Sequence, residues 1–211
     1  MTRVGFEELL GFHCAPVLMG EKPANLVSVS KTRGNEDAAS CSCLSDASPT
    51  EHVPALIKEY TSAFAGEGIR VEILCNCARH YMVLVYRPDR LTEYLKSPRV
   101  AELLWKDGYP KGGDLSCMLE LLKMRFAAKR DFPHEIGLFL GYPVEDVVGF
   151  RKHKGSNYKM CGYWKVYGDV AYARETFARF DQCRSYLLGQ LKAGCGLAQA
   201  IGMRPIPGSP A

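Results

Sequence analysis

The sequence predicts one α+β domain over residues 1–193, with a ferredoxin-like core in which β-α-β-β is followed by a helix-rich insertion, a last strand and a C-terminal helix. Short apolar runs bounded by turn residues are typical of strands, and four such runs occur along the chain. Between them lie segments whose apolar residues recur at helical spacing. With 211 residues, of which 47% are hydrophobic, the chain can bury roughly 70% of its unfolded surface without covalent staples.

The four predicted strands are residues 26–30, 70–75, 81–86 and 162–168. The second and third contain VEILC and YMVLVY, are joined by a short turn, and the third is ended by Pro88. Side chains alternate along a strand, so Lys165 and Tyr167 of the last run share one face. Trp164 and Val166 share the opposite face.

Helices are expected where apolar residues follow helical spacing and a start signal precedes them, either a capping side chain or a proline in the first turn. Glycines such as Gly108 and Gly141 mark helix ends. The expected helices cover residues 5–12 and 51–66 and then begin at Asp89, Ser97, Asp114, Pro133, Pro143 and Asp169.

Two segments are expected to lack regular structure. Residues 31–50 are small and polar and form a predicted loop, and the Gly- and Pro-rich residues 194–211 form a predicted disordered tail. The start of the chain carries acidic Glu7 and Glu8 and lacks the apolar core of a secretory signal. Because no apolar run approaches the roughly 18 residues of a membrane span, we expect a cytoplasmic protein without membrane contact.

Composition narrows the classes of function. The net charge of +4 and the isoelectric point of about 8.5 fall short of the strong basic bias of a dedicated nucleic-acid binder, so nucleic acid is not the expected partner. The nine cysteines are an odd number in a chain without a leader, which disfavours a disulfide framework. They indicate a reducing cytosol, such as that of an anaerobe.

Two Cys-x-Cys pairs, Cys41-Cys43 and Cys75-Cys77, offer four thiolates that could bind zinc or an iron–sulfur cluster. On a strand, Cys75 and Cys77 would share one face. A one-residue spacing is a weaker signal than Cys-x₂-Cys, and the first pair lies in the polar loop. We therefore assign no metal site and no particular cofactor.

The sequence His13-Cys14 places a thiol beside an imidazole near a helix end, which is typical of a thiol nucleophile or a soft-metal or haem ligand. The alternative is a buried cysteine next to a capping histidine, since neighbours in sequence point apart. Lys22 and Asn25 follow closely and are candidate ligand-binding residues.

Residues 133–169 are the richest in candidate functional groups. His134 and Glu135 fall in the first turn of a helix and could transfer protons as a pair, or could serve as a surface histidine and a helix cap. Lys165 and Tyr167 on one strand face could bind an anionic ligand, or form the ordinary polar face of a half-exposed strand. Further candidate ligand contacts in this segment are Tyr142 and Asp146.

The spacing of glycines and apolar residues over 136–147 also matches a DNA-reading helix-turn-helix, with phosphate contacts from Arg151, Lys152 and Lys154. The reading helix would carry Glu145 and Asp146, which repel phosphate. A structural αα-turn is therefore favoured.

Six motifs together resemble the bacterial domain-of-unknown-function family numbered 3793 over about residues 5–191: HCAP, KPANL, VLVYRP, PHEIGLFLGYP, DVVGF and GYWKVYGD. The resemblance implies a single full-length cytosolic domain of an anaerobic bacterium and supplies no mechanism. The longer 31–50 loop and the Pro-rich tail depart from the family pattern, which weakens a metal site on Cys41 and Cys43. The motif positions that the resemblance marks are His13, Cys14, His134, Glu135, Gly141, Tyr142, Pro143, Asp146, Lys165 and Tyr167.

These patterns favour a protein that binds a small anionic or redox-active ligand, with a thiol-dependent enzyme as one form of that function. Cys14 would be the nucleophile or ligand, His134 and Glu135 the proton-transfer groups, and Lys165 an anion contact. The alternative is a non-enzymatic interaction or regulatory protein that presents the 133–150 element to a protein partner through Tyr142, Pro143 and Phe150. Nucleic-acid binding ranks third.

Overall fold

The computed structural model of the chain describes residues 1–31, 53–78, 80–128 and 133–203. The predicted loop 31–50 therefore falls, from residue 32 onward, outside the described residues, and so does the Cys41-Cys43 pair. Residues 204–211 of the predicted tail also lie outside them.

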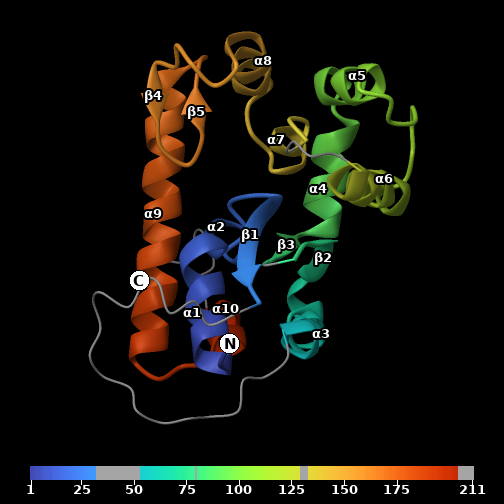
Figure 1. The fold of residues 1–211 in the computed structure, drawn as a ribbon. Coiled ribbons are helices and arrows are strands. Elements are labelled where there is room, and N and C mark those ends of the chain that lie inside the picture. Colours follow the sequence, from blue (N-terminus) through green and yellow to red (C-terminus); the bar gives the residue numbers. More distant parts are fainter. Residues whose placement is uncertain (32–52, 79, 129–132, 204–211) are drawn as a thin grey trace.

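A three-stranded antiparallel sheet forms the centre of the fold, in the order β1-β3-β2 (Figure 1). The strands are β1 (Ala24–Ser30), β2 (Arg70–Asn76) and β3 (His80–Tyr86). They occur where the apolar runs predicted the first three strands. Both β1 and β2 run antiparallel to β3, so they are parallel to each other, and α3 (Val53–Ala63) and the 3-10 turn η1 (Ala65–Glu67) lie on the connection between them.

The fourth predicted strand does not join this sheet. Its segment forms a separate hairpin of β4 (Met160–Cys161) and β5 (Lys165–Val166). The buried Trp164 and Val166 pack on α9 (Val170–Lys192), against Ala173 and Phe180. The fold is α+β as expected, but the four-stranded ferredoxin-like sheet is not confirmed, because the apolar face of the last strand is covered by a helix.

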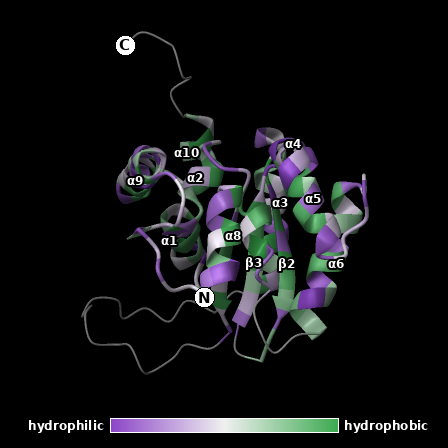
Figure 2. Cartoon of the chain, turned by 90° about the horizontal axis from the view of Figure 1, so that it is seen from above, coloured by the Kyte–Doolittle hydropathy of each residue, from purple (hydrophilic) through white to green (hydrophobic). Residues whose placement is uncertain are grey.

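Helices cover both faces of the sheet, as Figures 1 and 2 show. On one face, α1 (Arg3–His13), α2 (Ala15–Leu18), α3 and α9 enclose a core with Val27, Val29, Val83 and Val85 of the sheet. The other face is covered by α4 (Pro88–Lys96), α5 (Pro98–Lys106), α6 (Leu115–Ala128) and α7 (Ile136–Phe139). The remaining helix of the 133–169 segment, α8 (Val144–His153), adds Val147 to this second core.

Several predicted helix starts are confirmed by their caps. The carboxylate of Asp169 accepts a hydrogen bond from Tyr172 N at 3.0 Å and caps α9. Asp114 accepts from Cys117 N at 2.7 Å at the start of α6. Prolines occupy the first turn of α4 and α5, where the missing N–H costs no helical hydrogen bond. Helix α4 begins at Pro88, so Asp89 lies in its first turn and is not its cap.

The prediction of a disordered tail from residue 194 is wrong for its first part. Residues Leu197–Gly202 form α10, whose Leu197, Ala200 and Ile201 are fully buried in the core beside α9. The backbone N–H of Leu197 also donates to Glu7 Oε1 at 3.1 Å. The Gly-rich composition indicated a flexible end, but these three apolar side chains stabilise a docked helix.

Buried Arg87 ties the end of β3 to the N-terminal layer, a role that sequence reasoning did not assign. Its guanidinium donates to the carbonyls of Val17 and Leu18 at 2.7 and 2.6 Å, at the end of α2. It also donates to Glu67 O at 2.8 Å. One side chain therefore joins the end of α2 and the 3-10 turn η1 to the end of β3.

The turn between α7 and α8 packs directly on the segment before β1. Gly141 has φ +72°, and a Cβ atom there would lie 2.7 Å from Pro23 Cδ. Only glycine adopts this conformation and this close approach at low cost. The contact sets Lys22 and Tyr142 side by side, with the Lys22 ammonium 4.7 Å from the Tyr142 ring centroid.

Replacing Gly141 with alanine should destabilise the fold, because the new methyl group adds both a left-handed-conformation penalty and a clash with Pro23. We expect the free energy of unfolding to fall by about 2–4 kcal/mol. Gly189→Ala is the matched control: no atom lies within 4 Å of its Cβ position in the interior of α9, so it should stabilise by about 0.5–1 kcal/mol. Urea unfolding of both variants measures this, and equal midpoints would contradict the Gly141–Pro23 contact.

Candidate functional site

A cavity of about 660 Å³ lies between α1, the central sheet, α7, α8 and the β4–β5 hairpin. Five of the ten predicted site residues line it, namely His13, His134, Tyr142, Asp146 and Lys165. The structure therefore brings together side chains that lie more than 150 positions apart in the sequence. The others lie elsewhere: Cys14, Lys22, Asn25, Glu135 and Tyr167 do not line it.

Most of the cavity wall is apolar. Leu26, Val27 and Met82 contribute from β1 and β3, and Ile136, Leu140, Val147 and Phe150 from α7 and α8. The indole of Trp164 closes the hairpin side. Sequence reasoning missed these wall residues as ligand-site residues. It predicted that Trp164 and Val166 share a face opposite Lys165, and both side chains are buried in the structure.

Two histidines face the cavity from different parts of the chain. His13 ends α1, and its ring lies 4.9 Å from that of Phe12. Burial, with a smaller contribution from the charge of Arg184, lowers the pKa of His13. Its imidazole is thus biased towards the neutral form, which both donates and accepts hydrogen bonds. His134 precedes α7 and is exposed, with its ring 5.7 Å from that of Phe150.

Lys165 is the third basic group of the cavity. Its ammonium donates to Gly155 O at 2.7 Å and lies 5.0 Å from the ring centroid of Tyr158. It also lies 6.0 Å from the ring of Phe150. An ammonium has three N–H donors, so this hydrogen bond orients the group and leaves donors for a ligand.

Asp146 lines the cavity but is already fully engaged. It is 3% exposed and accepts hydrogen bonds from Trp164 Nε1 at 2.6 Å and from the backbone N–H groups of Tyr167 and Gly168 at 2.7 Å each. These contacts join α8 to the hairpin and fix the indole in the cavity wall. The side chain thus positions the indole and the end of the hairpin, and its role as a ligand contact stays a prediction.

Glu135 points away from the cavity, so the adjacent His134 and Glu135 do not form a pair. The buried carboxylate accepts from Arg125 Nη1 at 2.7 Å and from Tyr109 Oη at 3.4 Å. Arg125 also donates to Asp107 O. This network joins α5, α6 and α7, so the contacts of this carboxylate are structural.

The predicted nucleophile, Cys14, is fully buried in the core between α1 and α2. Burial raises the pKa of its thiol to about 12, against a smaller lowering by the charge of Lys22. A reactive thiolate needs an accessible, electropositive setting, whereas this thiol is buried, does not line the cavity and has a raised pKa. The position of Cys14 therefore matches the alternative stated for His13-Cys14, in which the cysteine is buried and the histidine lies at a helix end.

Lys22 is buried behind Tyr142. Its ammonium lies 4.7 Å from the ring centroid of Tyr142 and 6.0 Å from that of Phe180. Among the described residues no carboxylate lies within ion-pair distance of it. Burial lowers the pKa of this amine to about 7, while the nearby Cys14 acts in the opposite direction.

Asn25 and Tyr167 each hold a buried oxygen without a partner in the described part of the chain, Oδ1 and the hydroxyl respectively. Asn25 lies on β1 and pairs in register with Val85. The Tyr167 ring stacks on His153 at 5.7 Å and covers Gly149, where any Cβ atom would clash with it. Neither residue reaches the cavity.

The 133–150 element has the geometry of a structural αα-turn. Helix α7 is a single turn of four residues, too short for the first helix of a DNA-reading motif. Arg151 is paired with Asp107 at 2.6 Å, and Tyr142 stacks on Trp164 with ring centroids 5.2 Å apart. Arg151, a predicted phosphate contact, and Tyr142, a predicted contact to a protein partner, therefore both have partners within the fold.

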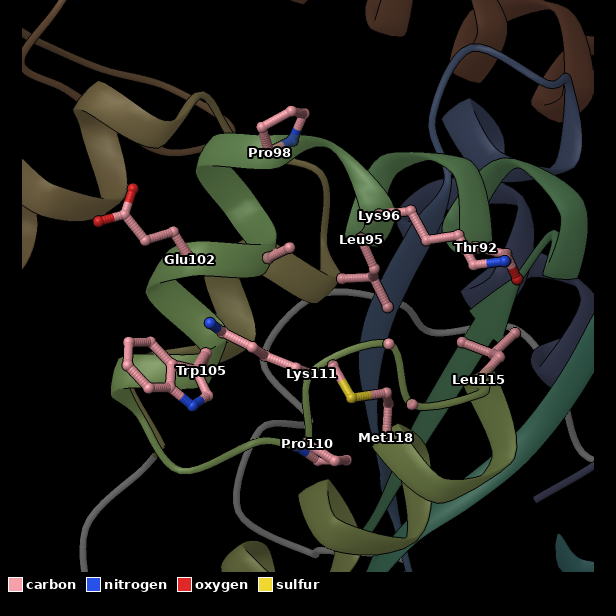
Figure 3. A pocket seen from close by; sticks show the side chains of 13 residues that line it. Thr92, Leu95, Lys96, Pro98, Glu102, Trp105, Pro110, Lys111, Leu115 and Met118 are labelled. Carbon is pink, nitrogen blue, oxygen red and sulfur yellow. The ribbon is translucent and has the colours of Figure 1, made fainter.

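A second hollow, of about 540 Å³, lies between α4, α5, α6 and the loop after α5. Figure 3 shows Trp105, Lys111 and Glu102 at its outer edge and Met118 and Leu115 deeper among the helices. The Lys111 ammonium lies 4.2 Å from the Trp105 ring. None of the ten predicted site residues lines it.

In the part of the chain that the structure describes, no helix combines the length and the apolar character needed to cross a bilayer. A family model with the description "Protein of unknown function (DUF3793)" matches residues 10–201. No curated protein and no solved structure matches the chain.

Replacing Lys22 with methionine should remove a pH dependence of stability. Its pKa is about 7 in the fold, against an ordinary value of 10.5, so between these values the unfolded chain binds a proton that the folded chain does not. The wild-type free energy of unfolding should therefore rise with pH relative to Lys22→Met, by up to about 1.4 kcal/mol per pH unit. Burial also raises the pKa of Cys14 and of Tyr142 to about 12, but both groups are present in both proteins, so the difference between wild type and variant reports Lys22.

Urea unfolding of the wild type and of Lys22→Met at pH 7, 8 and 9 measures the difference. Lys58→Met, on the exposed side of α3, is the control and should differ from the wild type by a constant amount. A constant difference for Lys22→Met as well would show that its amine stays protonated in the fold.

Proposed function

The chain belongs to the DUF3793 family of proteins of unknown function over residues 10–201, and we propose that it binds a small amphipathic anion in the 660 Å³ cavity. Such a ligand has an apolar or aromatic body and a carboxylate, phosphate or similar group. The observation that carries this proposal is the joint placement of His13, His134 and Lys165 around an otherwise apolar and aromatic wall.

The size and lining of the cavity support a ligand of this class. Small-molecule sites are typically concave spaces of about 300–1,000 Å³ with mostly apolar walls and a few polar groups that orient the ligand. Here three of the polar side chains are basic, those of His13, His134 and Lys165, and the one carboxylate of the lining, Asp146, already accepts three hydrogen bonds. The basic side chains can therefore donate to an anionic ligand, because Asp146 already has its hydrogen-bond donors from within the fold.

The aromatic wall is held in place before any ligand arrives. Trp164 is fixed by its hydrogen bond to Asp146, by stacking on Tyr142 and by edge contact with Phe177 at 4.5 Å. A preformed wall lowers the entropy cost of binding, which favours affinity for a flat apolar group. Binding is better supported than thiol catalysis, because Cys14 lies outside the cavity and its pKa is raised.

Replacing Lys165 with methionine should weaken the binding of an aromatic anion by roughly tenfold, as expected for loss of one charge-assisted contact of about 1.4 kcal/mol. The probe is 8-anilinonaphthalene-1-sulfonate, titrated by its own fluorescence. The matched control is Lys159→Met, since Lys159 also donates to a backbone carbonyl beside the hairpin, that of Gly168 at 2.8 Å, but does not line the cavity.

A second variant tests the location. Ser28 is exposed and lines the cavity, so Ser28→Trp should fill it and abolish probe binding without disturbing the core. Ser30→Trp, two positions along the same strand face and outside the cavity, should leave binding intact. Unchanged affinity in both Lys165→Met and Ser28→Trp would refute the proposed site.

A further inference from the structure

The Cys75-Cys77 pair, which the proposed function does not use, lies at the end of β2. Its two sulfur atoms are 2.8 Å apart. We propose that Cys75 and Cys77 form a redox site that closes to an intramolecular disulfide by exchange with a low-molecular-weight disulfide. The site needs no other part of the chain, and it stands independently of the cavity.

The local backbone explains why these two thiols meet. Residues two apart on a regular strand are about 6.6–6.8 Å apart at Cα, at the upper end of the range that a disulfide can span. The register with β3 shifts between Ile73 and Cys75, which is a bulge that bends and twists the strand. The strand ends at Asn76, and Cys77 follows outside it while its N–H still donates to His80 O at 2.9 Å.

Closing the bond requires little movement. A disulfide has a sulfur–sulfur distance of about 2.05 Å, so the two atoms must approach by less than about 1 Å. Among the described cysteines this is the one pair whose sulfurs are in contact. Cys117 and Cys161 are exposed single thiols, and Cys14 and Cys183 are buried.

The two thiols differ in exposure, which sets the order of the steps. Cys77 is exposed, whereas Cys75 is half-buried. Burial, and then the hydrogen bond and charge of Cys77, raise the pKa of Cys75 to about 11, with a smaller lowering by Lys31. Attack by thiolate is the chemical step of exchange, so Cys77 reacts first and Cys75 resolves.

The exchange is balanced in atoms and electrons. The Cys77 sulfur attacks one sulfur of the external disulfide R–S–S–R, and a mixed Cys77–S–R disulfide forms as the first R–S⁻ leaves. The Cys75 sulfur then attacks the Cys77 sulfur and expels the second R–S⁻. The two thiol protons pass to the two leaving thiolates, so the external disulfide is reduced to two thiols and the protein dithiol is oxidised.

Glutathione disulfide is the probe for the test. The folded, reduced protein is incubated with it, acid-quenched, alkylated, digested and analysed by mass spectrometry. We expect the peptide with Cys75 and Cys77 to lose two hydrogens, while Cys161 retains a glutathione adduct. Because the resolving thiol is held next to the mixed disulfide, glutathione occupancy on Cys77 should be at least about tenfold lower than on Cys161.

Two single variants make the test independent of folding defects. In Cys75→Ser the resolving thiol is absent, so Cys77 should retain its glutathione adduct at the level of Cys161. In Cys161→Ser the Cys75–Cys77 disulfide should form as in the wild type. Stable glutathione on wild-type Cys77, or a disulfide from Cys77 to Cys41 or Cys43, would overturn the proposal.

Discussion

A buried carboxylate must receive hydrogen bonds from its surroundings. In this fold the hydrogen bonds that Asp146 accepts hold the candidate site together. Its three donors come from an indole and two consecutive backbone amides on the far side of the cavity. Burying an ionised group without such partners would cost several kcal/mol. The carboxylate therefore connects α8 to the hairpin that packs on α9, and it fixes the position of the Trp164 indole.

Local sequence patterns predicted the central sheet well because strand alternation is a local property. The expected strands 26–30, 70–75 and 81–86 coincide with β1, β2 and β3 within a few residues. The fourth strand could not be placed in the same way, since its position depends on Phe180 and Asp146, which are distant in sequence. Helix α10 was missed because glycine and proline dominate the composition around three buried apolar residues.

The sequence identified residues that line the candidate site, but only five of the ten predicted residues meet at the cavity. Neighbouring residues point in different directions in helices and in turns. Of each pair, His13-Cys14 and His134-Glu135, the histidine lines the cavity and the other residue is buried elsewhere. The partner of Glu135, Arg125, carries no local signal in the sequence. Motif density indicated the correct region, but the direction of each side chain is a tertiary property.

The packing of α1 on α9 has a consequence for biosynthesis. Gly11 of α1 faces Leu191, and Phe12 O accepts from Arg184 Nε at 3.0 Å, so α1 packs on a helix whose contacting Arg184 lies 172 positions further along the chain (Figure 1). Chains emerge from the ribosome N-terminus first. Until α9 has been made, the apolar side of α1 that it will cover has no partner within the chain, so α1 reaches its final packing only after α9 has emerged.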